Sequence, residues 1–438
     1  MISGSETIML GLPVPLLLGV LVPTALIFLG GGNTSLQSLV ALSAGASAFT
    51  LMGLNLFLAT RPKYVERWFG GLDRLYVSHK WIGILVLPLI LFHKNVGMLD
   101  IEGQIAATGL AKTSVDVAEL VFIPLLVLLL ASWLKKIPFG SKIPGLKRFR
   151  GDLIPYHWWR WSHRALGVLF LGIVFHQLFV KVPFNMNALA AQYLNFWAIV
   201  GAVSFVYTQF LAPMRPRAYI ISKVEKHPAA TIIDAEPVRS FRKIKPGRFA
   251  VISIARRGLR EPHPFTVSRF GEDGSIQFSI RGLGDYTRRV RDLVEVGDKM
   301  TVEGGYGAFD YRRGPDRQVW LAGGIGVTPF LTFADSLTAE DTRRFQMVYC
   351  VNKPEEAVGL DRFRAAEARC PGFKFRLYVS KEEGRFSAEK LTELVPFEMK
   401  DAGLWFCGPA PMREAVLKDL KASGNRPKSV HFEEFEFR

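Results

Sequence analysis

Long apolar stretches in the first half of the chain limit its fold more than any other sequence feature. They cover roughly residues 8–30, 37–60, 78–98, 118–134, 162–180 and 194–212. A helix needs about 20 apolar residues to cross the hydrocarbon core of a bilayer, so the sequence predicts six spanning helices. The first stretch has no Lys or Arg before it and no small-residue cleavage site, so we interpret it as a retained span and not as a signal peptide.

The second half of the chain has a different composition, with charged residues throughout. Short alternating segments such as AYIISKVEKH and ATIIDAEPV predict a small antiparallel β-barrel, and strand–turn–helix patterns follow it. We therefore predict a six-helix transmembrane bundle, followed by a small antiparallel β-barrel domain and an α/β domain. The expected domain boundaries are 1–213, 214–315 and 316–438.

The basic residues of the first half indicate how the spans are oriented. Lys and Arg in short loops favour the cytoplasmic side of a membrane. The loops after the second and fourth spans are rich in both, whereas residues 99–117 contain only Lys112 against Asp100, Glu102 and Asp116. The sequence thus predicts a multi-pass protein of the cell (inner) membrane, with both termini and the whole second half in the cytoplasm.

The formal net charge of +16 could also indicate a nucleic-acid partner. Many of the basic residues lie between apolar segments, so we assign them to membrane topology and expect a lipid bilayer, not nucleic acid, as the partner. The three cysteines, Cys350, Cys370 and Cys407, have neither metal-ligand spacing nor a paired framework. They are expected to be free thiols in a reducing cytoplasm.

Four histidines lie in or beside the third and fifth apolar stretches, two in each. They are His79 and His93, then His163 and His176. Ionisable side chains within spans are rare and usually functional. At about 1.5 Å of rise per residue, separations of 14 and 13 residues place the two members of each pair about 20 Å apart along a helix. The pattern predicts ligands at two depths, one near each membrane face.

Two histidines from facing helices can bind one haem iron on opposite sides. With both helices running outward, His79 would pair with His163 on the cytoplasmic side and His93 with His176 on the outer side. Interfacial histidines that bond to neighbours are the structural alternative. A separation of 13 residues turns His176 about 140° away from His163 on a straight helix. Either that helix tightens locally, or its ligands leave it at different angles.

Two segments of the predicted barrel, HPFTVS at 263–268 and SIRGLGDYT at 279–287, are typical of a flavin site. Arg281 can neutralise a pyrophosphate, and Gly282 and Gly284 let backbone N–H groups approach it. Thr287 could add a hydroxyl at the start of a helix. An ordinary turn before a helix is the alternative for this second segment.

The segment QVWLAGGIGVTPFL predicts a buried strand, a phosphate-binding turn and a helix N-terminus. Its turn residues are Gly323, Gly324 and Gly326. Thr328 is the expected N-cap of the helix, and Pro329 is its expected first residue. It differs from G-x-G-x-x-G, which favours a variant nucleotide fold with a turn of its own.

The segment LWFCGPAPM has the same order of strand, turn and helix. Cys407, Gly408 and Pro409 would therefore lie at another carboxyl edge of the sheet, where open α/β sheets bind ligands.

A third edge segment follows the predicted strand FRLYV. Its residues Ser380, Lys381 and Arg385 are candidates for the 2′-phosphate of NADPH, because Lys and Arg pair with phosphate. A solvated surface loop explains the same residues equally well. We favour NADPH as the nucleotide and keep NADH as the alternative.

In this order the motifs resemble the superfamily of NADPH oxidases and ferric reductases, transmembrane flavocytochromes b, in a compact bacterial form. The resemblance covers nearly the whole chain. It rests on the two histidine pairs and on HPFT, IRGLGDYT, VEGGYGAF, GGIGVTPF, CGP and the terminal HFEEFEFR. It implies a six-helix transmembrane bundle that binds two haems, followed by a ferredoxin-reductase-like unit with an antiparallel β-barrel FAD domain and an α/β NAD(P) domain. The implied cofactors are FAD, two b-type haems and NAD(P)H.

The resemblance also implies individual roles. The FAD site would be lined by His263, Pro264, Phe265 and Thr266. The pyrophosphate of FAD would be held by Arg281, Gly284 and Thr287. NAD(P)H would be contacted by Gly324, Gly326, Thr328 and Pro329. Its nicotinamide would lie beside Cys407, Gly408 and Pro409. Phe435 would stack on the flavin, with a strand core residue as the alternative. The residues expected nearest the reacting atoms are Thr266, Cys407 and Phe435.

The chain departs from the family pattern in two places. Many relatives have Pro where this chain has Gly305, which leaves that turn a structural role. No D-x-[DN]-x-[DN]-G calcium loop is present, so Ca²⁺ switching by an EF-hand is not expected. The sequence also contains no evident regulatory module and no evident protein partner.

The order of cofactors predicts electron transfer from cytosolic NAD(P)H through FAD and the haems to an acceptor outside. FAD is needed because hydride carries two electrons and haem iron accepts one. The leading hypothesis is an oxidase that reduces O₂ to superoxide. A ferric-chelate reductase would use the same order of cofactors and is the second hypothesis. Lys94 and Lys181 could attract its anionic chelates. A module that donates electrons to a quinone or an extracytoplasmic partner is the third hypothesis.

Overall fold

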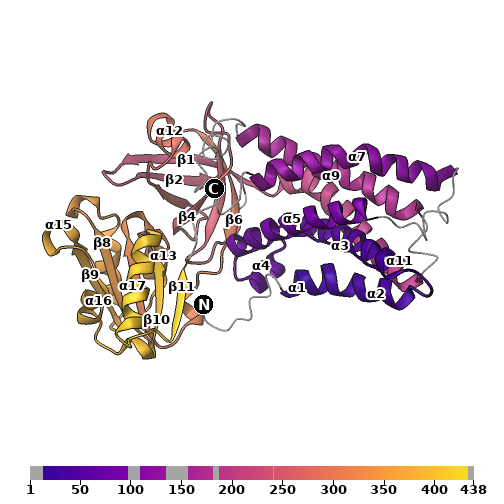
Figure 1. The fold of residues 1–438 in the computed structure, drawn as a ribbon. Coiled ribbons are helices and arrows are strands. Elements are labelled where there is room, and N and C mark those ends of the chain that lie inside the picture. Colours follow the sequence, from indigo (N-terminus) through magenta and orange to yellow (C-terminus); the bar gives the residue numbers. More distant parts are fainter. Residues whose placement is uncertain (1–12, 97–108, 135–155, 181–186, 240, 433–438) are drawn as a thin grey trace. The chain divides into compact units, whose positions relative to one another are not determined.

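The computed structural model describes residues 13–96, 109–134, 156–180, 187–239 and 241–432. The chain divides into two compact units, one with nearly all of residues 9–214 and one with residues 215–438. The first unit is helical, and the second combines strands and helices (Figure 1).

Six helical segments of the first unit are long and apolar enough to cross a membrane, within the part of the chain that is described. The first segment runs through α1 (Pro13–Leu16), η1 (Leu17–Leu21) and α2 (Val22–Gly30). The middle four are α3 (Leu36–Ala59), α5 (Leu72–Asn95), α7 (Gly109–Leu134) and α9 (Tyr156–Phe179), and the short α4 (Lys63–Phe69) lies between α3 and α5. The last is α11 (Ala188–Val206), which continues through η3 (Tyr207–Leu211) and η4 (Ala212–Met214).

The predicted number of spans is confirmed, but α7 begins well before residue 118. Its first turns contain Lys112, Asp116 and Glu119, which lower the local hydropathy without preventing a helix. The apolar run therefore predicted only the inner part of this helix.

Glycines allow α3 and α11 to pack closely. A Cβ atom on Gly53 would lie 2.9 Å from the carbonyl oxygen of Trp197, and one on Gly201 would lie 3.1 Å from the Cα of Gly53. Such small-residue contacts are typical of helix pairs in membranes, where lipid offers no hydrophobic force between helices. These glycines thus fix how near the two helices approach.

The second unit begins with a closed antiparallel barrel in the strand order β1-β2-β5-β4-β3-β6. The strands are β1 (Arg217–Lys226), β2 (Thr231–Pro237), β3 (Phe249–Ile254), β4 (His263–Phe270), β5 (Ile276–Ile280) and β6 (Lys299–Tyr306). The helix α12 (Asp285–Leu293) lies between β5 and β6. Ile221, Ile233, Ile252 and Phe278 are fully buried and fill the barrel. This confirms the predicted barrel.

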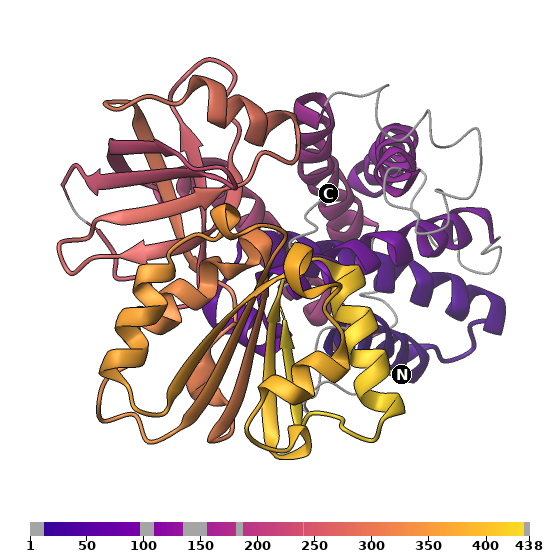
Figure 2. The same ribbon diagram turned by 90° about the vertical axis from the view of Figure 1, so that its left-hand side faces the viewer.

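A five-stranded sheet follows in the order β11-β10-β7-β8-β9, and all its pairings are parallel. Its strands are β7 (Arg317–Gly323), β8 (Arg344–Val351), β9 (Phe373–Val379), β10 (Ala402–Cys407) and β11 (Ser429–Phe432). The connecting helices include α13 (Thr328–Ser336), α14 (Leu360–Arg369), α15 (Ser380–Glu383), α16 (Ala388–Leu394) and α17 (Ala410–Ala422). Figure 2 shows helices on both faces of this sheet.

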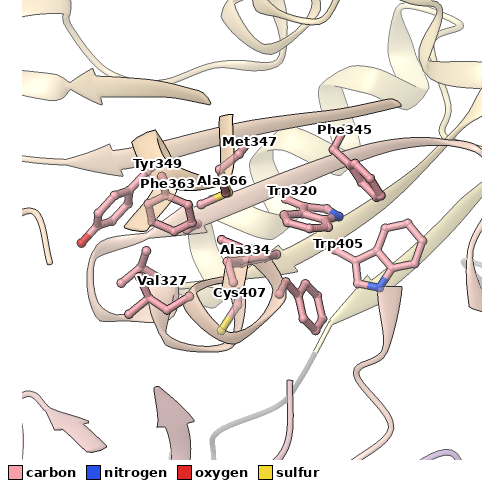
Figure 3. Packing of buried hydrophobic residues seen from close by; sticks show 14 of the residues in the cluster. Trp320, Val327, Ala334, Phe345, Met347, Tyr349, Phe363, Ala366, Trp405 and Cys407 are labelled. Atoms are coloured by element: carbon pink, nitrogen blue, oxygen red, sulfur yellow. The ribbon is translucent and has the colours of Figure 1, made fainter. Parts of the chain in front are cut away.

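The central strand β7 is buried on both faces, as expected for a parallel sheet covered by helices. Trp320 and Ala322 face the cluster under α13 and α14, whereas Val319 and Leu321 face the cluster under α16 and α17. Figure 3 shows Trp320 in the first cluster with Phe345, Trp405 and Cys407. This rigid core holds the carboxyl ends of the strands, where the predicted nucleotide residues lie.

Replacing Gly53 by Val is expected to force α3 and α11 apart, because the new side chain would meet a backbone carbonyl that cannot rotate away. Overpacking of this kind costs about 1–3 kcal/mol. The melting temperature of the purified protein in detergent should fall. Gly83→Ala on α5 is the matched control, since its added methyl would meet nothing nearer than 3.6 Å. Equal melting temperatures for both variants would contradict the packing role.

Candidate functional site

The His79 and His163 rings face each other between α5 and α9. Their ring centres are 6.1 Å apart, and the ring planes make an angle of 66°. Two imidazoles bound to opposite sides of one metal ion, each with a bond of about 2 Å, also place their ring centres about 6 Å apart. The spacing of this pair therefore suits axial ligation of one iron.

The second pair, His93 and His176, lies further along the same two helices, and its members are close enough to interact electrostatically. The Nδ1 atom of His93 is 2.9 Å from the carbonyl oxygen of Ala41, and that of His176 is 3.2 Å from the carbonyl oxygen of Ser114. A carbonyl can only accept, so each Nδ1 must carry the proton. Each Nε2 is then left with the lone pair that a metal requires.

Helices α3 and α7 orient the histidines that α5 and α9 carry. The Ser132 hydroxyl of α7 lies 3.3 Å from Nδ1 of His163, and the Asn55 amide of α3 donates to the backbone oxygen of His79 at 3.1 Å. The glycine at position 45 on α3 leaves room for the His93 ring, which an added Cβ would approach to 2.6 Å. Nδ1 of His79 is buried and has no hydrogen-bond partner among the described residues.

Helix α9 is α-helical along its described length, so it does not tighten between its two histidines. The second alternative from the sequence therefore holds, and His163 and His176 leave the helix at different angles. Both still reach α7, one at Ser132 and the other at Ser114.

These observations fit two haems. The part of the chain that is described has no group of three or more His, Cys, Asp or Glu side chains placed to hold a metal ion. Paired histidines suit an iron whose other ligands come from a macrocycle. When bound, the two groups would accept and release single electrons, and His79, His163, His93 and His176 would hold them.

The flavin segment forms the first half of β4. Thr266 is buried, and its Oγ1 has no hydrogen-bond partner among the described residues. A buried hydroxyl without a partner is costly, and a flavin edge would supply one. The His263 ring stacks on Tyr286 with centres 3.7 Å apart, and Phe265 lies near the same ring at 6.4 Å. Pro264 lies between His263 and Phe265 on β4.

Sequence reasoning missed Tyr286, although it lies within the quoted motif IRGLGDYT. Burial and the nearby Glu261 carboxylate raise the pKa of Tyr286, so its hydroxyl stays protonated and donates to the Leu259 carbonyl at 3.2 Å. The ring thereby fixes His263 against α12. Its position in a motif of glycines and charges was the only signal in the sequence.

The loop from Arg281 to Thr287 leads into α12. The Thr287 hydroxyl accepts hydrogen bonds from the backbone N–H groups of Leu283 and Gly284, both at 2.9 Å, and so holds the turn in shape. Gly282 and Arg281 are exposed, and the Arg281 guanidinium lies beside Gly324, where an added Cβ would come within 3.3 Å of it. The guanidinium can thus serve an anion that lies between the two glycine turns.

The two nucleotide motifs interlock at the carboxyl edge of the sheet. A Cβ on Gly326 would lie 2.2 Å from the Cys407 carbonyl oxygen, and one on Gly408 would lie 2.9 Å from the nitrogen of Gly323. Gly324 has φ +56°, a conformation that favours glycine. The backbones of the two turns touch because neither carries a side chain there.

The remaining residues at this edge follow the same turns. Thr328 and Pro329 form the buried first turn of α13, which starts one residue earlier than predicted because Val327, and not Thr328, is the N-cap. Pro409 lies against Gly323, where an added Cβ would come within 2.8 Å of its Cδ. Cys407 ends β10 and is buried.

The neighbouring Cys350 is also buried, and burial raises the pKa of its thiol, which therefore stays neutral. Ser380 and Lys381 start α15 at the far edge of the sheet, and Arg385 is exposed beyond it. Strands β7, β8 and β9 are neighbours in the sheet, so β8 lies between the glycine turn after β7 and this group, and the role of this group stays a prediction. Phe435 lies outside the described residues, and its role stays a prediction.

A histidine-bearing membrane bundle joined to a flavin barrel and a nucleotide-binding sheet defines an electron-transfer oxidoreductase. Residues 44–174 match the ferric reductase like transmembrane component, 231–310 the FAD-binding domain and 320–418 the oxidoreductase NAD-binding domain. The chain has the architecture of the NADPH oxidase and ferric reductase superfamily, in which these three domains follow one another.

Curated relatives resemble the second unit. The toluate 1,2-dioxygenase electron transfer component of Pseudomonas putida is 26% identical over 197 residues, which are 43% of this chain and 58% of that protein. The 2-halobenzoate 1,2-dioxygenase electron transfer component of Burkholderia cepacia is 30% identical over 200 residues, again 43% and 58%. The chain thus spans little more than half the length of these relatives.

Among solved structures, flavohemoglobin from Malassezia yamatoensis is 15% identical with a TM-score of 0.49, and the match covers 92% of this chain and 99% of that one. The FAD/NAD-binding domain of nitric oxide dioxygenase from Vibrio cholerae O1 biovar El Tor is 19% identical with a TM-score of 0.43. That match covers 50% of this chain and 97% of the domain.

Replacing Ser132 by Ala should raise the midpoint potential of one haem, because a metal-bound imidazole that loses its Nδ1–H bond becomes a weaker electron donor. Potentiometric titration of the haem absorbance measures this change. Ser114→Ala is the matched control on the same helix, since Ser114 bonds His176 through its backbone oxygen and its side chain bonds Ala111. A potential that stays unchanged in Ser132→Ala contradicts the assignment.

Replacing Gly326 by Ala should raise the KM for NADPH at least about tenfold, equivalent to about 1.4 kcal/mol of binding. The new methyl would overlap the Cys407 carbonyl and push the two turns apart. Steady-state reduction of a soluble acceptor at varied NADPH gives the KM, and the FAD content should stay at the wild-type level. If FAD is lost in parallel, the effect is a general one on folding.

Proposed function

We propose that this chain is a bacterial NADPH oxidase that moves electrons from cytosolic NADPH through FAD and two b-type haems to O₂, which leaves as superoxide. The observation that carries the proposal is the occurrence of two histidine pairs at two depths between α5 and α9. One histidine pair could hold a haem at one depth of the bilayer only. Two pairs supply a route from one membrane face to the other.

Each group of residues has a distinct task in this route. The turns at Gly324 and Cys407 bind and orient the nucleotide, and Arg281 neutralises phosphate charge between the two glycine turns. Thr266 and the stacked His263 and Tyr286 hold the flavin. When bound, FAD would supply the conversion between two-electron hydride chemistry and single electrons, which is why its site must lie between those of the nucleotide and the haems. The protein fixes the order of the cofactors, and no acid or base is needed at the outer end.

Each iron would be held by a pair of histidines, so the acceptor would have to receive its electron without binding the iron itself. This suits O₂ as well as a ferric chelate. Lys94, which could attract an anionic chelate, forms an ion pair with Glu119 at 3.0 Å, and this pair largely cancels its charge. The local electrostatics thus favour a small neutral acceptor, and Lys181 lies outside the described residues. The ferric-chelate reductase is the runner-up.

A second candidate function comes from the comparisons. The curated relatives are electron transfer components of dioxygenases. This favours a module that donates electrons to an extracytoplasmic partner or a quinone. Slow turnover with both O₂ and ferric chelates would indicate this function.

Membrane orientation and nucleotide preference belong to the same proposal. The basic loops after the second and fourth spans support a cytoplasmic position for both termini and for the nucleotide site, in the cell (inner) membrane. Lys381 and Arg385 at the adenosine end support NADPH over NADH. The domain boundaries at 213/214 and 315/316 remain part of this interpretation.

The purified protein in detergent, supplied with FAD, should reduce cytochrome c when NADPH is added, and superoxide dismutase should remove most of the signal. His93→Ala should abolish this activity and keep flavin reduction by NADPH, because it disrupts only the second histidine pair. Haem absorbance is recorded in parallel. If dismutase has little effect and ferric citrate is reduced quickly, the protein is a ferric-chelate reductase. A protein without a b-type haem spectrum rules out both enzymes.

A further inference from the structure

The flavin strand β4 contains a β-bulge directly after its cofactor residues. Its pairing with β5 passes from Val267 opposite Phe278 to Arg269 opposite Gln277, so Ser268 is the extra residue. The Ser268 side chain is fully buried and donates to the Gln277 carbonyl at 3.0 Å. Bulges of this kind interrupt the regular ladder and often lie next to active sites. Here the bulge turns the backbone carbonyl of Ser268 toward the neighbouring domain.

Arg362 of α14, in the α/β domain, binds that carbonyl. Its Nη2 donates to the Ser268 oxygen at 2.6 Å. The same guanidinium pairs with Asp335 of α13, where Nε donates to Oδ1 at 3.0 Å and Nη2 donates to Oδ2. The Arg362 side chain is only 16% exposed, so water screens these bonds weakly. One planar side chain therefore connects the flavin strand with α13.

Helix α13 is the helix that begins at the glycine turn of the nucleotide site. A second arginine of α14, Arg369, caps its other end by donating to the carbonyls of Ala334 and Leu337, both at 2.7 Å. The Thr332 hydroxyl accepts from the backbone N–H of Gly247 in the barrel at 2.8 Å. Helices α13 and α14 thus form one block. Helix α13 packs against β4 of the barrel, and Arg362 adds a charged hydrogen bond to this contact.

We propose that Arg362 is a positioning residue for hydride transfer. It fixes the distance and angle between the flavin strand and the nucleotide turn, and it touches neither cofactor. This inference rests on the NADPH-to-FAD half of the proposed function and is independent of the acceptor. Misplacement of reacting groups by about 1 Å can lower a rate about a hundredfold, so a loose connection here should affect chemistry more than binding.

The test is anaerobic stopped-flow reduction of the flavin by NADPH in the full-length protein. In Arg362→Ala, the rate constant at saturating NADPH should fall about tenfold to a hundredfold. The half-saturating NADPH concentration and the FAD content should stay close to wild type. The long-wavelength absorption of nicotinamide stacked on flavin should weaken in parallel. Asp335→Asn, which keeps the shape of the side chain, should give a smaller loss in the same direction.

Two further variants sharpen the test. Arg364→Ala is the matched control, because Arg364 is an exposed arginine on the same helix, and it should behave as wild type. Arg362→Lys should recover part of the flavin reduction rate that Arg362→Ala loses. The lysine ammonium can pair with Asp335 but cannot bind its carboxylate through two hydrogen bonds as the planar guanidinium does.

The possible outcomes separate this inference from the proposed function. Wild-type rates in both Arg362→Ala and Asp335→Asn overturn the inference and leave the proposed function intact. A rate loss explained by lost FAD in both variants also overturns it, because the role is then structural. Failure of the wild-type protein itself to reduce FAD with NADPH overturns the proposed function.

Discussion

The structure of the membrane unit depends on how four imidazole rings are held in an apolar bundle. A charged ring is costly there, and a neutral ring still has one donor and one acceptor nitrogen to satisfy. In three of the rings Nδ1 lies within hydrogen-bond distance of α3 or α7, namely at Ala41, Ser132 and Ser114. With Nδ1 protonated, the Nε2 acceptor of each of these rings would be left for the iron of the proposed haem. The supporting helices must therefore approach closely, which the glycine at position 45 permits.

In the second unit, close approach between segments depends on the backbone and not on side chains. The turns after β7 and β10 come into contact because Gly326 and Gly408 lack side chains at the point where they meet. Parallel pairing of β7 with β10 aligns Ala322 with Cys407 and so fixes the register of the two turns. Any movement of one turn moves the other, and a nucleotide held by both meets a single rigid edge.

Sequence patterns predicted the elements of this fold well and their contacts only in part. Apolar length predicted the six spans, and strand alternation predicted the barrel. The depth of His79 and His93 follows from helical rise alone. The angles at which His163 and His176 leave α9 depend on where α7 packs, which no local pattern encodes. For the same reason Ser132, Tyr286 and Arg362 were not found, since each acquires its role from a partner distant in sequence.

The two units place different demands on precision. Single electrons passed between the two proposed haems would need only an approximate distance, and backbone carbonyls and one serine hydroxyl are what hold the rings. Hydride transfer requires two reacting atoms to be aligned, which is a much stricter condition. The flavin strand and the nucleotide helix belong to different domains, and Arg362 connects them by donating to the Ser268 carbonyl of β4 while it pairs with Asp335 of α13. This polar connection of the second unit thus lies where hydride transfer would tolerate the least movement.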